Sequence, residues 1–390
     1  MPSSRLPQNL ELNAVSRALD AKRRAGTPVV DLTETNPTRA GFDYPKELLE
    51  PLANPRALDY DPQPLGLWPA RVAVAADFRR RGTVISADRV ALTSSTSEAY
   101  ALLFKLLCDA GDAVLVPHPS YPLFEHLTQL ESVRAVPYAL EYHGAWRIDV
   151  DSIRRQPADR VRAILIVSPN NPTGSFLHRD DLAELSELAA ANDWAIIGDE
   201  VFADYPLDPA PAATHVLAGA DVLTFSLGGL SKSAGLPQLK LGWIGFGGPA
   251  GTVDKAMKAY ELIADTYLSV STPVQASAVE LILSGASIRA QILARVRRNL
   301  ESLRMFAAAH PSLEVLQVEG GWCAVIQVPK LRSEEALVLE LLEQDSVLIH
   351  PGYFFDFSRE AFIVVSLLVE PTRFDWAMPR VLARASGVAA

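Results

Sequence analysis

The sequence predicts an α/β protein with a large domain, in which helices flank a mostly parallel sheet, and a smaller α/β domain. Three observations lead to this prediction. Helical and strand-like stretches alternate between residues 68 and 268, which is typical of parallel strands with helices on both faces. After about residue 270, a long helical stretch precedes four strand-like runs. The 390 residues exceed what a single core usually holds, so two domains are expected.

The expected elements follow from the periodicity of apolar residues. The N-terminal segment is expected to form a helix over 9–25, a strand over 28–32 and a loop over 33–38. In the alternating region, the expected helices are 68–81, 97–110, 122–131, 179–192 and 252–268. The expected strands there are 113–117, 133–138, 163–167, 194–198, 221–226 and 240–246. Beyond residue 270, we expect a helix over 286–309 and strands over 313–318, 322–328, 347–349 and 362–367.

Composition and charge exclude several classes of partner. A net charge of −10 provides no basic patch for a phosphate backbone, so neither nucleic acid nor an anionic membrane is expected as a partner. No apolar stretch approaches the roughly 20 residues that cross a bilayer, and no targeting segment is recognisable, which favours a cytoplasmic protein. Cys108 and Cys323 form no disulfide or metal pattern and are expected to be core thiols. No metal site is expected, because the histidines lack paired ligand spacing.

Polar residues follow three successive strand-like runs. Asn171 lies in Ser-Pro-Asn-Asn-Pro-Thr-Gly-Ser, Asp199 lies in Gly-Asp-Glu-Val-Phe-Ala-Asp, and Lys232 lies in Leu-Ser-Lys-Ser-Ala-Gly before a Pro-containing turn. Because the carboxyl ends of parallel strands line one crevice, these three side chains can converge there. A lysine held at a fixed point in such a crevice can form a Schiff base. The pattern therefore predicts a cofactor site with Lys232 at its centre.

This order of asparagine, aspartate and lysine resembles the class I/II aminotransferases, the fold-type I enzymes that use pyridoxal phosphate. The likeness runs from about Asn36 to the C-terminus. It implies a large cofactor-binding domain over residues 45–265 and a small domain built from residues 1–44 and 266–390. It also implies that Lys232 holds the cofactor as an internal aldimine and then acts as the base, while Asp199 keeps the pyridine nitrogen protonated and Asn171 donates to the phenolic oxygen.

The implied reaction moves an amino group from an amino acid or amine to a 2-oxo acid by double displacement. A C–S β-lyase or a decarboxylase on the same scaffold is an alternative, because the same three residues would prepare any of these carbanions. A non-catalytic protein that binds pyridoxal phosphate, as a sensor or a biosynthetic partner, is a third hypothesis of a different class. The amino donor, the acceptor and the pathway are not predicted, because specificity depends on the site and not on the fold.

A phosphate site is predicted where Leu-Thr-Ser-Ser-Thr-Ser-Glu leads from a strand into a helix, since free amides and the helix dipole favour an anion there. Ser95 and Glu98 also form the pattern of a capping box. In the family this loop cradles the cofactor phosphate. Thr96 and Ser97 match the contacting pair, Ser95 stands where glycine is usual, and Ser231 is a further candidate hydroxyl.

Two tyrosines complete the implied cofactor site. Tyr121, in Pro-His-Pro-Ser-Tyr-Pro, matches the family's aromatic residue that lies against the cofactor ring. Tyr60, in Leu-Asp-Tyr-Asp-Pro, is similar to the tyrosine that reaches from one subunit to the phosphate bound by the other. The resemblance therefore implies a homodimer in which each site needs two chains.

Two departures from the family pattern concern the cofactor. Phe202 stands where a tyrosine is usual and cannot donate to the phenolic oxygen, so we expect an aldimine pKa higher than is usual in the family. Lys240 stands where an arginine is usual and can neutralise a phosphate as a point charge.

The third departure concerns the substrate. Val364 occupies the position of the family's arginine that binds the substrate α-carboxylate. Either another cation takes over, with Arg39 after the Asn36 loop and Arg373 as candidates by position, or the substrate lacks an ordinary α-carboxylate.

Overall fold

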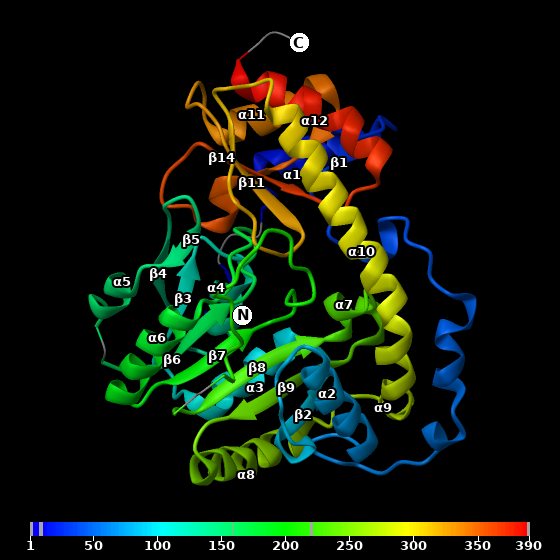
Figure 1. Cartoon of the computed structure of the whole chain (residues 1–390), viewed down its shortest axis with the longest axis vertical. Helices are drawn as coiled ribbons and strands as arrows, with labels where there is room; N and C mark the ends of the chain where they lie inside the picture. The colour runs from blue at the N-terminus through cyan, green and yellow to red at the C-terminus, as the bar shows by residue number, and fades with distance from the viewer. Residues whose placement is uncertain (1–2, 8–10, 158, 219–220, 388–390) are drawn as a thin grey trace.

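The computed structural model describes residues 3–7, 11–157, 159–218 and 221–387. Its largest element is an eight-stranded sheet with the order β2-β9-β8-β7-β6-β3-β4-β5 (Figure 1). The four pairs from β8 to β4 are parallel, whereas β9 and β5 run antiparallel to their neighbours. The strands are β2 (Val90–Thr93), β3 (Ala113–His118), β4 (Arg134–Tyr142), β5 (Trp146–Ile148), β6 (Val161–Val167), β7 (Ala195–Asp199), β8 (Thr224–Gly229) and β9 (Gly242–Gly247).

Apolar side chains cover both faces of this sheet. In β6, Leu165 and Val167 belong to the cluster of buried residues under α3 and α8, while Ile164 and Ile166 belong to the cluster under α5 and α6. Burial on both faces explains why the parallel strands read as continuous apolar runs. The covering helices are α2 (Trp68–Arg80), α3 (Thr96–Leu107), α4 (Leu123–Leu130), α5 (Val150–Arg154), α6 (Arg179–Asn192) and α8 (Ala250–Tyr267).

A second, antiparallel sheet lies above the first and has the order β10-β11-β14-β13 (Figure 1). Its strands are β10 (Glu314–Val315), β11 (Cys323–Gln327), β13 (His350–Pro351) and β14 (Phe362–Ser366). Nearby, the N-terminal strand β1 (Val30–Asp31) pairs in parallel with β12 (Val347–Leu348). The helices of this part are α1 (Ala14–Arg24), α10 (Ala278–Ala307), α11 (Glu334–Glu340), the π-helical turn η6 (Leu341–Asp345) and α12 (Pro371–Ser386).

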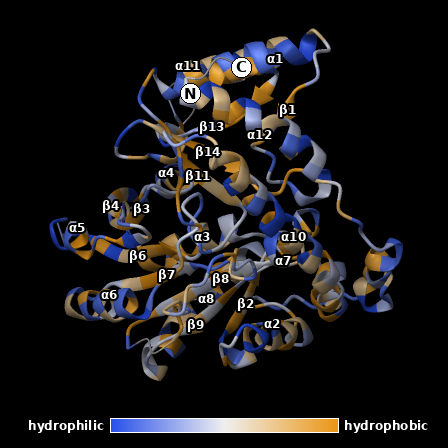
Figure 2. Cartoon of the chain, turned by 45° about the horizontal axis from the view of Figure 1, so that its top comes forward, coloured by the Kyte–Doolittle hydropathy of each residue, from blue (hydrophilic) through white to orange (hydrophobic). Residues whose placement is uncertain are grey.

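Short helical turns connect these elements. They are the 3₁₀ turns η1 (Pro37–Arg39), η2 (Lys46–Ala53), η3 (Pro55–Leu58), η4 (Ala87–Arg89), η5 (Pro237–Leu239) and η7 (Gly352–Phe355), with the short helices α7 (Leu230–Ser233) and α9 (Thr272–Ala276). Hydrophobic colouring follows the strands of the large sheet, whereas peripheral helices such as α1 carry hydrophilic stretches (Figure 2). Within the described residues, every helix is too short or too polar to span a membrane.

The predicted fold class is confirmed, and several boundaries differ from expectation. The helix expected over 9–25 is α1, and its expected first two residues lie outside the described ranges. The long helix begins eight residues earlier than expected, at Ala278. The strand expected to end near Leu92 is β2, whereas no expected strand corresponds to β5 or β13. The division into 45–265 and the flanking segments stays a prediction, and one buried cluster contains residues from both sides, including Trp243 and Ile363.

The long helix α10 is fastened to the end of the small sheet by Asn299. Its amide nitrogen donates to the carbonyl oxygens of Leu367 at 2.8 Å and Val369 at 2.7 Å, and the side chain is fully buried. Leu367 and Val369 directly follow β14, where the backbone leaves the sheet and needs other donors. Asn299 therefore supplies hydrogen bonds that neither the helix nor the sheet can supply.

We expect Asn299→Ala to lower the free energy of unfolding by about 2 to 4 kcal/mol, because two buried carbonyl groups lose a donor. Urea denaturation measures the change. Ser287→Ala is the control, since its exposed hydroxyl bonds only to the Ser284 carbonyl of the same helix. The expectation is wrong if the two variants are equally stable.

Candidate active site

A cavity of about 350 Å³ lies at the carboxyl edge of the large sheet. Asp199 ends β7, Asn171 follows β6, and Lys232 follows β8, so three neighbouring parallel strands deliver them to one place. Most of the residues expected from the sequence line this cavity together: Ser95, Thr96, Ser97, Tyr121, Asn171, Asp199, Phe202, Ser231, Lys232 and Lys240.

Three long-range hydrogen bonds hold the backbone around Lys232. The Tyr205 hydroxyl donates to the carbonyl oxygen of Lys232 itself. Arg289, from α10, donates to the Ser233 carbonyl at 2.9 Å, and Tyr44 donates to the Gly235 carbonyl at 2.7 Å. Because α7 is a single turn, few carbonyl groups in and just after it can be satisfied within the helix, and these side chains provide additional donors. The lysine thus projects from a backbone that is fixed from three directions.

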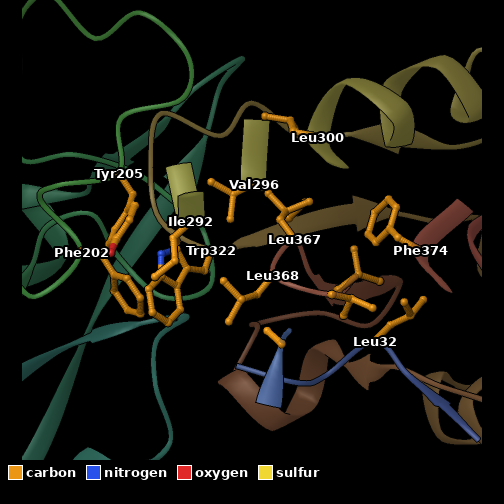
Figure 3. Close-up of a cluster of buried hydrophobic side chains, with 14 of the residues drawn as sticks. Leu32, Phe202, Tyr205, Ile292, Val296, Leu300, Trp322, Leu367, Leu368 and Phe374 are labelled. Carbon is orange, nitrogen blue, oxygen red and sulfur yellow. The ribbon is translucent and has the colours of Figure 1, made fainter. Parts of the chain in front are cut away.

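The Lys232 amine lies over two aromatic rings. Its Nζ is 4.8 Å from the centre of the Trp322 ring and 5.5 Å from that of Phe202. These two rings meet edge to face, and the Tyr205 ring also meets Trp322 edge to face (Figure 3). Burial lowers the pKa of Lys232 below its ordinary value, although Cys323 and Asp199 nearby act in the opposite direction. A buried amine of this kind is more readily deprotonated than a surface lysine and can serve as a nucleophile or base.

Asp199 is buried, and each of its carboxylate oxygens accepts one hydrogen bond from the chain. The Tyr100 hydroxyl donates to Oδ2 at 2.8 Å, and the Val201 amide donates to Oδ1 at 3.2 Å. Burial raises the pKa of Asp199 to about 6, while these two donors and Lys232 favour the charged form. The negative charge of the adjacent Glu200 also raises the pKa of Asp199. Asp199 is therefore a carboxylate above about pH 6 and a proton donor below it.

The N-terminus of α3 lies at one end of the cavity, called the anion-binding end here because free amides at a helix N-terminus favour an anion. Ser95 Oγ accepts from the Glu98 amide at 3.1 Å, and Glu98 Oε2 accepts from the Ser94 amide at 2.6 Å, which is the expected capping box. The cap satisfies these two amides, so Thr96 and Ser97 are left as first-turn donors for a ligand. Lys240 adds a positive charge to the same cavity.

The strand β11 contributes the wall of the cavity opposite the large sheet. Before it, the Glu319 carboxylate contacts His178 Nε2 at 3.1 Å and accepts from the Phe176 amide at 2.8 Å. The Gly320 amide donates to the Gly174 carbonyl at 2.8 Å. These contacts dock the segment that carries Trp322 and Cys323 onto the loop after Asn171.

Some residues expected at the site lie elsewhere in the single chain. Tyr60 is 79% exposed and lies in a separate crevice beside Tyr267. Arg39 is exposed and does not line the cavity, and the Asn36 side chain caps η1 by accepting from the Thr38 amide. Val364 is 1% exposed and packs in the apolar cluster between the two sheets.

Three residues at the site were not expected from the sequence. Tyr100 reads as one more core residue of an amphipathic helix, and its contact with Asp199 joins positions 99 residues apart. Cys323 lines the cavity, although it was expected to be only a core thiol. Thr35 lines the cavity from the N-terminal loop, whereas Asn36 and Arg39 of the same loop do not. The alternation of β11 would have placed Cys323 on the same face as Val325, but not beside Lys232.

The fold and the cavity define an α/β protein in which a buried lysine amine and a buried carboxylate line one cavity at the carboxyl edge of a parallel sheet. The chain belongs to the family described as aminotransferase class I and II, whose model matches residues 67–371. The family interpretation of the sequence is thereby confirmed.

Individual relatives agree with this assignment. The chain is 30% identical over 360 residues to glutamate-pyruvate aminotransferase AlaA from Haemophilus influenzae, covering 88% of this chain and 87% of that one. It is 28% identical over 375 residues to the Escherichia coli AlaA, covering 92% and 87%. A crystal structure of an aminotransferase from Escherichia coli superposes with a TM-score of 0.88 and 25% identity over 100% of this chain and 99% of that one. The protein is an enzyme that transfers amino groups.

We expect Gly242→Ala to destabilise the anion-binding end of the cavity. A Cβ atom there would lie 2.9 Å from Thr93 Oγ1 and 3.0 Å from the Ser95 carbonyl carbon, so the turn before α3 would have to shift. The expected cost is about 1 to 3 kcal/mol in the free energy of unfolding. Gly251→Ala is the matched control, since a Cβ atom there meets nothing within 4 Å. Equal stability of the two variants in urea denaturation would contradict this expectation.

Proposed function

We propose that the chain binds pyridoxal 5′-phosphate in the cavity at Lys232 and moves an amino group from an amino acid or amine to a 2-oxo acid by double displacement. The observation that carries the proposal is the placement of a buried amine, a buried carboxylate and a helix N-terminus around one cavity. These three groups match the aldehyde, the ring nitrogen and the phosphate of this cofactor. Family membership supports the same proposal.

The residues of the cavity fit the cofactor. The Asn171 Oδ1 atom is buried and has no hydrogen-bond partner among the described residues, so a bound polar group would complete its side-chain amide. Gly229 and Gly242 line the cavity, and each leaves too little room for a Cβ atom, so the backbone itself forms that wall. Tyr121 supplies an aromatic face, and Ser231 and Lys240 supply polar groups at the anion-binding end.

When bound, pyridoxal phosphate draws electrons away from the Cα–H bond of the attached amino acid. The Asp199 carboxylate would hold a proton on the ring nitrogen, because an opposite charge nearby favours the cationic form. The Lys232 amine, whose pKa is lowered by burial, would serve as the base that moves the Cα proton of the substrate. Trp322 and Phe202 would exclude water from the amine while it is free.

The substrate end of the cavity borders the N-terminal loop, because Thr35 lines it. Asn36 and Arg39 follow in this loop, and we propose that it contacts the substrate. Among the described residues that line the cavity, the cations are Lys232 and Lys240, and both are assigned to the cofactor. A substrate carboxylate would therefore need a cation brought from outside the present lining, and Arg39 is the candidate nearest in the chain.

Two unpaired cysteines support a location in a reducing compartment, the cytoplasm.

Lys232→Ala is expected to abolish amino transfer, because Lys240, the other described amine that lines the cavity, is assigned to the phosphate. The measurement is the absorbance of protein with bound pyridoxal phosphate before and after single amino acids and amines are added, followed by a 2-oxo acid. A donor that changes the spectrum, with reversal by the 2-oxo acid, is expected for the unaltered chain and for the control Lys258→Ala, whose side chain is exposed. Release of ammonia with pyruvate, or of carbon dioxide, in place of reversal would contradict the proposal.

We propose further that the enzyme is a homodimer in which Tyr60 of each chain reaches the phosphate in the other. Large exposed apolar side chains gather on η3, α2 and α10, three elements connected through contacts with α9 and with one another, and a second copy would cover them. They are Leu58, Tyr60, Trp68, Val72, Val279 and Leu283.

Leu58→Asp is expected to convert the dimer to monomers and to weaken the binding of pyridoxal phosphate. Leu58 is 90% exposed in the single chain, so a charge there costs little unless a partner covers it. Sedimentation velocity measures the oligomeric state. Met305→Asp is the control, since Met305 is exposed near the other end of α10. If both variants sediment as the unaltered chain does, the interface is not at this surface.

A further inference from the structure

Tyr100 is a fully enclosed tyrosine whose hydroxyl faces a single charged group. It projects from α3 beneath the cavity, and its ring packs against Phe104 and edge to face against Phe124 at 5.5 Å between centres. Phe124 lines the cavity, so Tyr100 forms the layer directly behind it. The hydroxyl donates to Asp199 Oδ2 at 2.8 Å. A phenylalanine would fill the same apolar space, so what the hydroxyl adds is its hydrogen bond to Asp199.

We propose that Tyr100 is a positioning residue for amino transfer, whose hydroxyl holds the Asp199 carboxylate in one orientation and favours its anionic form. The inference rests on the proposed function, in which Asp199 faces the ring nitrogen of pyridoxal phosphate. A carboxylate oxygen has two acceptor positions. With Oδ2 occupied by Tyr100 and Oδ1 by the Val201 amide, one position on each oxygen is left for the cofactor, and rotation of the carboxylate would break both bonds.

The hydroxyl also has an electrostatic effect that other groups do not duplicate. The groups that face Asp199 are Tyr100 from α3, Lys232 from α7 and Glu200, which directly follows β7. Glu200 opposes the charged form of Asp199, and its own charge is held by Ser226 and His215. Burial raises the pKa of Asp199, whereas the hydrogen bond from Tyr100 lowers it, followed by that from Val201. Tyr100 is the strongest side-chain group that keeps this carboxylate ionised near neutral pH.

Tyr100→Phe removes the hydroxyl and keeps the ring. The pKa of Asp199 in the folded chain lies above the ordinary value, so the protonated form persists to about pH 6 in the cofactor-free chain. Loss of the Tyr100 hydroxyl should raise this pKa further. We expect the affinity for pyridoxal phosphate to fall as pH drops, with a midpoint near pH 6 in the unaltered chain and about one unit higher in Tyr100→Phe. Quenching of tryptophan fluorescence during titration with the cofactor measures this midpoint. The acid limb of kcat should move the same way, with the KM of the donor little changed at high pH.

Tyr138→Phe is the matched control. Its hydroxyl is equally buried and donates at 2.9 Å to the Leu165 carbonyl, so the variant loses a comparable hydrogen bond with no contact to Asp199. Both tyrosine variants should lose similar stability, but only Tyr100→Phe should move the midpoint. In a background of Asp199→Asn, Tyr100→Phe should cause no further shift, because its partner charge is gone.

The outcomes separate the two proposals. If the unaltered chain does not bind pyridoxal phosphate, both are overturned. If it binds and the midpoints of Tyr100→Phe and Tyr138→Phe coincide, the inference about Tyr100 fails while the proposed function stands. A shift that persists in the Asp199→Asn background also overturns the inference, because Tyr100 would then act on some group other than Asp199.

Discussion

Parallel pairing of β6, β7 and β8 is the constraint on which the site depends. It directs three carboxyl ends to one edge of the sheet, and each end carries one polar residue, namely Asn171, Asp199 and Lys232. Such pairing requires apolar cover on both faces, which the two buried clusters provide. The position of the cavity is therefore a consequence of how the large sheet is buried, while the short segments after β6 and β8 carry Asn171 and Lys232 into it.

Residues at strand ends could be predicted from the sequence because their position depends on local pattern. Lys232, Asp199 and Asn171 each follow an apolar run that can be read directly, and the turn at Ser95 has the spacing of a capping box. Tyr100 could not be predicted in the same way. Its role depends on the distance between a helix and a strand far apart in the chain, and nothing in its own surroundings in the sequence distinguishes it from the apolar residues beside it.

The small domain was predicted less completely, also for a physical reason. Its strands are short, and β12 in the apolar run 347–349 and β13 at His350–Pro351 belong to two different sheets although they are almost adjacent in the chain. Pairing of β1 with β12 joins segments more than 300 residues apart, a contact that periodicity does not encode. Contacts between distant segments also explain why the sequence did not indicate that Cys323 would line the cavity, although it did show a valine at position 364 in place of an arginine.

Glu319 and Gly320 contact the loop after Asn171 and so connect the small sheet to the edge of the large sheet. Trp322 follows Glu319 by three residues. The distance between its ring and the Lys232 amine therefore depends on this loop of the large sheet as well as on the small sheet. A Cβ atom on Gly174 would come within 2.6 Å of the Gly320 carbonyl oxygen, so the two segments are in close contact here and leave no room for a side chain. Because the distance of the Trp322 ring from the Lys232 amine depends on this contact between the two sheets, a change at Gly174 would act on the amine from outside the cavity lining.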